Sequence, residues 1–110
     1  MLRNGGSLDG VRILSPATVA LMTTNQTDTL YSHTGLGFGL GFYVILRPGA
    51  DARVESVGTF GWGGAYGSTY EVDPRQRLVI VFMTQLLPNH TTIAAELPML
   101  VYQALVDYKQ

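Results

Sequence analysis

The sequence contains no cysteine among its 110 residues, and only 14% of its residues are charged. The absence of cysteine excludes disulfide frameworks, thiolate zinc sites and cysteine nucleophiles, although it leaves the cellular compartment open. Seven Lys and Arg residues stand against eight Asp and Glu residues, which gives a net charge of −1. Without a basic run, the chain lacks the electrostatic footprint of a partner for nucleic acid or for an anionic membrane.

Long hydrophobic runs are also missing. No stretch approaches the roughly 20 apolar residues that a membrane span needs, and the first residues contain no apolar core of a signal peptide. The length allows a single domain, because domains typically hold about 100 to 150 residues. Yet 46% of the residues are hydrophobic, so we expect some apolar surface to need a partner.

The sequence offers no metal or cofactor site. His33 and His90 are isolated in polar segments, with no second ligand at metal-binding spacing beside either. The glycine-rich residues 35–42 do not fit a dinucleotide-binding or phosphate-binding loop, because they match neither spacing and precede no helix. We therefore expect no metal and no cofactor.

The first 34 residues contain two local signals. Asn4-Gly5-Gly6 is typical of a helix end. Ser15 followed by Pro16 is typical of a helix start, because Ser caps free backbone N–H groups and Pro suits the first helical position. The pattern predicts a short helix to about Thr23 and a loop over residues 24–34.

Period-two alternation and turn residues predict an α+β fold, with an antiparallel meander of about four strands and one C-terminal helix packed on one face. The strands are expected near residues 36–47, 53–60, 66–73 and 77–84. The helix is expected near residues 93–108, where apolar side chains recur at helical spacing. Pro98 either lies in the first turn of this helix or kinks it.

Residues 78–83 form an apolar run without alternation, Leu-Val-Ile-Val-Phe-Met. A strand that is apolar on both faces is typical of a sheet with other elements packed on both sides. One helix covers only one face, so we expect self-association through the other face if the N-terminal segment does not cover it.

Trp62 stands out because Gly61, Gly63 and Gly64 surround it. It either lies in a hairpin corner and folds back on the sheet, or faces a ligand beside exposed backbone N–H groups. Other polar residues have simpler explanations. Asp73 is expected to initiate a turn before Pro74, while Ser68, Thr69 and Glu71 lie in a strand without a nucleophile motif.

Taken together, five motifs resemble the C-terminal part of the serine β-lactamase-like family, which includes class C β-lactamases, family VIII carboxylesterases and penicillin-binding-protein-like enzymes. They are Asn4-Gly5-Gly6, residues 8–19 (Leu-Asp-Gly-Val-Arg-Ile-Leu-Ser-Pro-Ala-Thr-Val), residues 37–42 (Gly-Phe-Gly-Leu-Gly-Phe), residues 61–64 (Gly-Trp-Gly-Gly) and residues 72–74 (Val-Asp-Pro). Their order and spacing extend over nearly the whole chain.

The resemblance implies a site at the third motif of that family. Esterase-like members commonly have Trp-Gly-Gly there, which matches Trp62, Gly63 and Gly64. It further implies that Trp62 forms a wall of the acyl pocket and that Ala65 contributes its backbone N–H to an oxyanion hole. Small-molecule esters or β-lactams would be the substrates. The uncharged Trp62, where β-lactamases commonly have lysine, favours esters.

Two family motifs are absent. The only lysine is Lys109, the residue three before it is Val106, and so no Ser-x-x-Lys nucleophile exists. Tyr31-Ser32-His33 does not supply a Tyr-x-Asn element either. We therefore expect residues 1–110 to be a single partial domain, the C-terminal fragment of such a hydrolase, inactive alone. The alternatives are a non-catalytic module that binds a small molecule or peptide, and a truncated product without its own function.

Overall fold

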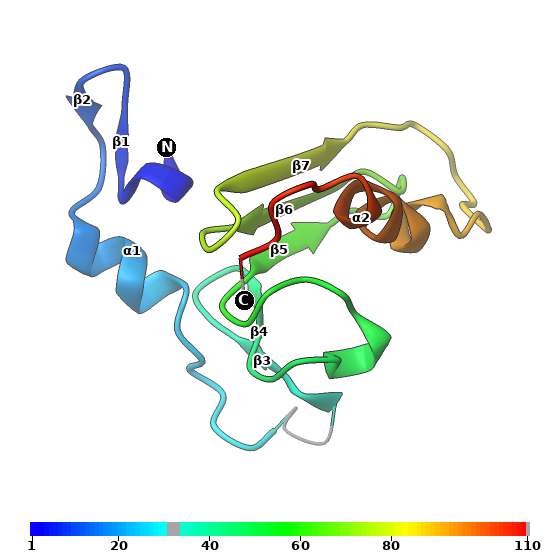
Figure 1. The fold of residues 1–110 in the computed structure, drawn as a ribbon, viewed down its shortest axis with the longest axis horizontal. Helices are drawn as coiled ribbons and strands as arrows, with labels where there is room; N and C mark the ends of the chain where they lie inside the picture. The colour runs from blue at the N-terminus through cyan, green and yellow to red at the C-terminus, as the bar shows by residue number, and fades with distance from the viewer. Residues whose placement is uncertain (31–33, 110) are drawn as a thin grey trace.

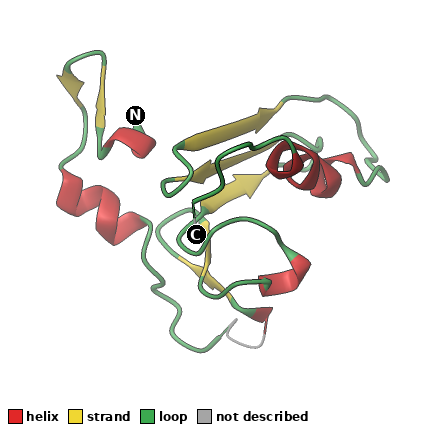
Figure 2. Ribbon diagram, viewed as in Figure 1, coloured by secondary structure: helices red, strands yellow, loops and turns green. Residues whose placement is uncertain are grey.

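A computed structural model of the protein describes residues 1–30 and 34–109 (Figures 1 and 2). In chain order its elements are η1 (Leu2–Asn4), β1 (Ser7–Leu8), β2 (Val11–Arg12), α1 (Pro16–Met22), β3 (Leu36–Phe38), β4 (Tyr43–Ile45), η3 (Ala50–Ala52), β5 (Phe60–Gly63), β6 (Thr69–Asp73), β7 (Leu78–Phe82) and α2 (Ile93–Gln103).

The main sheet is an antiparallel meander in the order β3-β4-β5-β6-β7. Helix α2 lies on one face of this sheet, and the small β1–β2 hairpin and α1 lie apart from α2 (Figure 1). The predicted α+β class and the antiparallel meander with its C-terminal helix are confirmed. The sheet has five strands where about four were expected.

Both N-terminal signals are confirmed. Gly5 follows η1 in the left-handed conformation, with φ of 62°. Ser15 caps α1, because its side chain accepts a hydrogen bond from the Thr18 N–H at 3.0 Å, and Pro16 occupies the first turn. Helix α1 then ends at Met22, close to the predicted end.

The prediction of one strand over residues 36–47 is wrong. The chain reverses between β3 and β4, and these two strands pair with each other as a hairpin. The Gly39 N–H donates to the Phe42 carbonyl at 2.8 Å, and Gly41 takes a φ of 95°. Gly41 therefore serves the turn, because it allows backbone geometry that side chains oppose. At Gly39, a Cβ atom would lie 2.0 Å from the Met22 carbonyl oxygen, so the close approach of that segment requires glycine.

The predicted strand over residues 53–60 is displaced along the chain. Residues 53–59 form an irregular segment with a turn, in which the Thr59 N–H bonds to the Ser56 carbonyl and Gly58 has a φ of 90°. Strand β5 begins only at Phe60 and continues through Trp62 to Gly63. Residues 61–63, which the predicted strand bounds leave between two strands, thus belong to a strand.

The remaining strand predictions overlap β6 and β7, but the helix near residues 93–108 is shorter than expected. Helix α2 begins at Ile93, includes Pro98 and ends at Gln103. Beyond it, the Lys109 backbone exchanges two hydrogen bonds with the Gln76 side chain, and the Tyr108 ring packs 6.3 Å from that of Tyr102. These contacts keep the last residues against the fold without a helical turn.

The two faces of the sheet differ in chemistry. On the face opposite α2, a core cluster consists of Phe42, Val44, Phe60 and Val72, with Leu2 and Met22 packed against it. The N-terminal segment therefore covers part of this face. Farther along, Val79 and Val81 of β7 are 46% and 58% exposed, so a patch of apolar surface stays uncovered.

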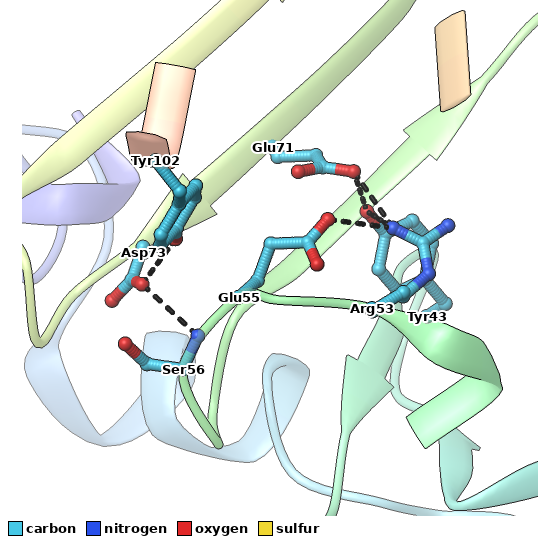
Figure 3. Close-up of polar contacts among 7 residues, drawn as sticks. All are labelled: Tyr43, Arg53, Glu55, Ser56, Glu71, Asp73 and Tyr102. Atoms are coloured by element: carbon cyan, nitrogen blue, oxygen red, sulfur yellow. Dashed lines mark hydrogen bonds and ion pairs between the residues drawn. The ribbon is translucent and has the colours of Figure 1, made fainter. Parts of the chain in front are cut away.

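Asp73 joins α2 to the sheet. It is buried, and it accepts hydrogen bonds from the Tyr102 hydroxyl of α2 and from the Ser56 backbone N–H (Figure 3). It also accepts a hydrogen bond from the Gln76 backbone N–H. The bond from Gln76 confirms its predicted role in the turn. Burial alone would raise the pKa of Asp73, but these hydrogen bonds outweigh it and hold that pKa below its usual value.

Because the pKa of Asp73 is lowered in the folded protein, the free energy of unfolding depends on pH in the acid range. The stabilisation by Asp73 is complete above the pKa of the unfolded state and is lost as the pH falls through the lower folded pKa. We expect the free energy of unfolding, measured by urea denaturation between pH 5 and 2, to fall more steeply in the wild type than in Asp73→Asn. At neutral pH that variant should lose about 1.5–3 kcal/mol, as expected for a bond to a charged group. Asp107→Asn, in the exposed C-terminal segment, should keep the wild-type slope; an equal slope in Asp73→Asn would contradict the assignment.

Candidate functional site

Trp62 lies within strand β5, directly opposite Tyr70 of β6. Its side chain is 49% exposed, and its ring meets the Phe38 ring edge-on at a centroid distance of 5.0 Å. The hairpin-corner interpretation of Trp62 is therefore wrong. The strand instead presents a half-exposed indole, anchored on one side by an aromatic neighbour.

The glycines around Trp62 have different structural reasons. At Gly61, a Cβ atom would lie 2.2 Å from the Tyr70 carbonyl oxygen, so the packing of the strands requires glycine there. At Gly63 the nearest atom would be a Thr69 methyl at 3.3 Å, and at Gly64 the Ser68 carbonyl oxygen at 3.9 Å. The fold itself thus makes a weak demand for glycine at 63 and none at 64.

Ala65 follows in a tight turn. The Gly64 N–H donates to the Ser68 carbonyl and the Gly67 N–H to the Gly64 carbonyl, both at 2.9 Å. This places Ala65 at the first central position of the turn, where it is exposed. Within residues 1–30 and 34–109 no acceptor is bonded to its backbone N–H, which leaves that donor available to a ligand.

Two hollows flank Trp62. One, of about 330 Å³, is lined by Tyr43, Arg53, Trp62, Gly63, Thr69, Glu71 and Ala94. The other, of about 270 Å³, is lined by Thr34, Leu36, Gly37, Phe38, Tyr43 and Trp62. A larger open hollow of about 550 Å³ lies beyond the turn, beside Tyr66 and Met83, and includes none of residues 62–65. Trp62 therefore separates a polar hollow from an apolar one.

Three residues that line the polar hollow, Tyr43, Arg53 and Glu71, form a charged cluster with Glu55, which lies outside it (Figure 3). Arg53 Nη1 lies 2.9 Å from Glu71 Oε1 and 3.1 Å from Glu55 Oε1. The Tyr43 hydroxyl donates to Glu71 Oε1 at 2.6 Å, and the Arg53 guanidinium stacks 4.6 Å from the centre of the Tyr43 ring. The Arg53 guanidinium thus contacts two carboxyl groups and one aromatic ring.

Burial governs the protonation of this cluster. It raises the pKa of the Tyr43 hydroxyl, and the adjacent Glu71 carboxylate raises it further, so that hydroxyl stays a donor. Burial also raises the pKa of Glu71, aided by the negative charge of Glu55. The Tyr43 hydrogen bond and Arg53 act in the opposite direction on Glu71 without cancelling the rise.

The nearby hydroxyl groups do not form a nucleophilic site. The Ser68 hydroxyl donates to the Thr84 carbonyl at 2.8 Å and accepts from the Thr84 N–H at 3.1 Å, so it ties β6 to the segment after β7. His90 is exposed, and His33 lies outside the described residues. In the part of the chain that the structure describes, no three His, Cys, Asp or Glu residues group as metal ligands, and no helix is long and apolar enough to cross a membrane.

Sequence reasoning singled out residues 62–65 but missed Tyr43, Arg53 and Glu55. The sequence predicts Glu71 on a strand without a role, whereas the structure buries it beside Tyr43 and Arg53. A signal was available, because Glu71 and Asp73 are acidic residues on the same face of a strand that must be largely buried. Their partners could not be named without the register of the sheet.

Comparisons with known proteins agree with this fold. The family model described as Beta-lactamase matches residues 1–102. Two curated proteins of Mycobacterium tuberculosis, Uncharacterized protein MT1414 of strain CDC 1551 / Oshkosh and Protein Rv1367c of strain ATCC 25618 / H37Rv, are each 36% identical over 107 residues. Each alignment covers 86% of this chain and 27% of the relative, so the chain spans about a quarter of their length.

A solved structure shares the architecture. It is described as EstCE1, a hydrolase with promiscuous acyltransferase activity, and superposes with a TM-score of 0.74 at 29% identity. The match covers 92% of this chain and 26% of EstCE1. With the family model covering nearly all of its residues, the chain belongs to the beta-lactamase family.

Proposed function

We propose that residues 62–65 form one wall of the acyl-binding site of a serine hydrolase that acts on esters or β-lactams through an acyl-enzyme. Trp62 lines the acyl pocket, Gly63 and Gly64 leave room for the substrate, and the Ala65 N–H is an oxyanion donor. The observation that carries the proposal is this exposed N–H without an acceptor, beside two glycines that the fold hardly requires.

The chemistry of the site favours esters over β-lactams. Trp62 contributes an uncharged indole and lines an apolar hollow of about 270 Å³ with Leu36 and Phe38. Such a wall suits an uncharged acyl or alcohol group better than the carboxylate of a β-lactam. The description of EstCE1 as a hydrolase with acyltransferase activity supports acyl transfer as the reaction class. In this proposal the nucleophile and its base are not among these 110 residues.

The purified 110-residue chain should therefore show no turnover. An oxyanion donor without a nucleophile has no tetrahedral intermediate to stabilise. The measurement is hydrolysis of p-nitrophenyl butyrate and of a chromogenic cephalosporin, with protein-free buffer as the baseline. Turnover that disappears when a serine of this chain is replaced would contradict the proposal.

The different roles of the glycines can be separated by their effects on stability. Gly64→Ala should change the free energy of unfolding by no more than about 1 kcal/mol, because its methyl group meets only ordinary contacts. Gly61→Ala should destabilise by about 1–3 kcal/mol or more, since its methyl group would overlap the Tyr70 carbonyl. Urea denaturation measures both. A large loss in Gly64→Ala would mean that the fold, not a ligand, explains that glycine.

We propose further that the uncovered sheet face and edge associate with a second copy of the chain. Strand β7 is the last strand of the sheet and carries no charge or proline over Leu78–Phe82, so nothing blocks pairing at its edge. Antiparallel pairing about Ile80 would bring Val79 of one copy opposite Val81 of the other. Both valines are about half exposed.

A lysine at position 81 should prevent this association, because it places like charges beside the twofold axis. Light scattering over a range of concentrations should find dimers of the wild type and monomers of Val81→Lys. Val106→Lys is the matched control, since Val106 is 95% exposed and lies outside the sheet. A strictly monomeric wild type would count against self-association.

A further inference from the structure

Tyr43, Gly61 and Glu71 lie in one row across three strands. Gly61 pairs with Tyr43 of β4 on one side and with Glu71 of β6 on the other. The Tyr43 hydroxyl reaches across Gly61 to Glu71 Oε1, and a Cβ atom at Gly61 would lie 3.1 Å from that hydroxyl. The missing side chain therefore gives Tyr43 its path to Glu71.

The charges of this cluster do not balance if both glutamates are ionised. Arg53 Nη1 contacts one oxygen of Glu55 and one of Glu71, whose side chains are only 2% and 9% exposed. The other oxygen of each carboxyl group, Oε2, is buried without a hydrogen-bond donor. Two buried carboxylates on one guanidinium leave an uncompensated negative charge, which is costly in a desolvated site.

Among the residues that the structure describes, the groups around Glu55 and Glu71 supply no further cation to balance the second carboxylate. Tyr43 from β4 and Arg53 and Glu55 from the irregular segment before β5 act on Glu71. Helix α2 lines the adjoining hollows with the uncharged side chains of Ala94, Ala95 and Met99. The exposed Asp51 lines the hollow beside Glu55. The charge of Glu55 also acts on the Tyr102 hydroxyl, which donates a hydrogen bond to Asp73. Glu55 and Glu71 thus meet at a single guanidinium nitrogen, Arg53 Nη1, at 3.1 and 2.9 Å.

We propose that Glu55 and Glu71 hold one proton between them, and that the pair positions the strand that carries Trp62 by keeping Tyr43 bridged to Glu71 across Gly61. The proton turns one carboxyl group into a donor and removes the excess charge. Tyr43 and Trp62 line the same two hollows, so a displacement of Tyr43 changes the surroundings of the indole. Glu71 is a positioning residue in this scheme, whether or not residues 62–65 serve a hydrolase.

The proton held by Glu55 and Glu71 determines how the free energy of unfolding changes with pH. Because the folded protein holds it more tightly than the unfolded chain, the raised pKa of Glu71 makes the free energy of unfolding fall as the pH rises from the ordinary glutamate value to the raised one. In the same interval, loss of the proton introduces a second buried negative charge beside Tyr43. That change should alter the fluorescence emission of Trp62 at a pH where the protein is still folded.

Trp62 is the only tryptophan of the chain, so its fluorescence reports on this site alone. The experiment follows its emission in the purified chain from pH 4 to 9, with near-UV circular dichroism to define the folded range. We expect a step with its midpoint above about 4.3, the ordinary glutamate pKa. Glu71→Gln and Glu55→Gln should each lose the step, because a pair with one amide has no shared proton. Glu96→Gln, on the exposed side of α2, should keep it.

Tyr43→Phe separates positioning from protonation. It removes the bridge and leaves both carboxyl groups, so carbon-13 NMR of the glutamate carboxyl groups should still detect the raised titration while the Trp62 step disappears. If only one glutamine variant folds, it is sufficient, since each removes the same proton. A wild type without a step, or a step that survives in Glu71→Gln, would overturn the proposal. No hydrolytic activity is measured, so the result is independent of the proposed enzymatic role.

Discussion

The close approach of three strands at Gly61 is the constraint on which the rest of the structure depends. A side chain at this position would overlap the Tyr70 carbonyl oxygen and crowd the Tyr43 hydroxyl. Its absence lets Tyr43 and Glu71 bond across β5, and it fixes the strand one residue before Trp62. Residues 62–65 follow directly after this contact, so it fixes their position together with the pairing to β6 and the Phe38 ring beside Trp62.

The sequence predicted those parts of the fold that depend on local chemistry. Ser15 and Pro16 suit the start of a helix by their own side-chain chemistry, and the β-branched and aromatic residues of the run 78–82 favour a strand. Glycine was the source of the main error. Alternation of glycine with large apolar residues predicted one strand over residues 36–47, whereas Gly41 takes a positive φ and the chain turns. A sequence does not show which conformation a glycine adopts.

For the candidate site, the sequence predicts only the residues that lie together in one motif. Residues 62–65 are consecutive, so a short motif is enough to single them out. Tyr43, Arg53 and Glu71 are separated by 10 to 28 positions and meet only because β4, β5 and β6 pair in one register. No pattern within a single segment indicates that Arg53 must neutralise a glutamate on another strand. Buried polar clusters of this kind become visible only when the topology is known.

The same buried polar groups restrict the register of the sheet. Glu71 and Asp73 point toward α2, and Val72 between them packs with Phe42 and Phe60 on the other face. A slip of β6 by one residue would move both carboxyl groups into that apolar cluster and bring Val72 under the helix. Such a slip would also separate Glu71 from Arg53 and Tyr43. The cluster therefore costs desolvation energy, but a slipped register would bury the same carboxyl groups without their partners, which disfavours that alternative pairing.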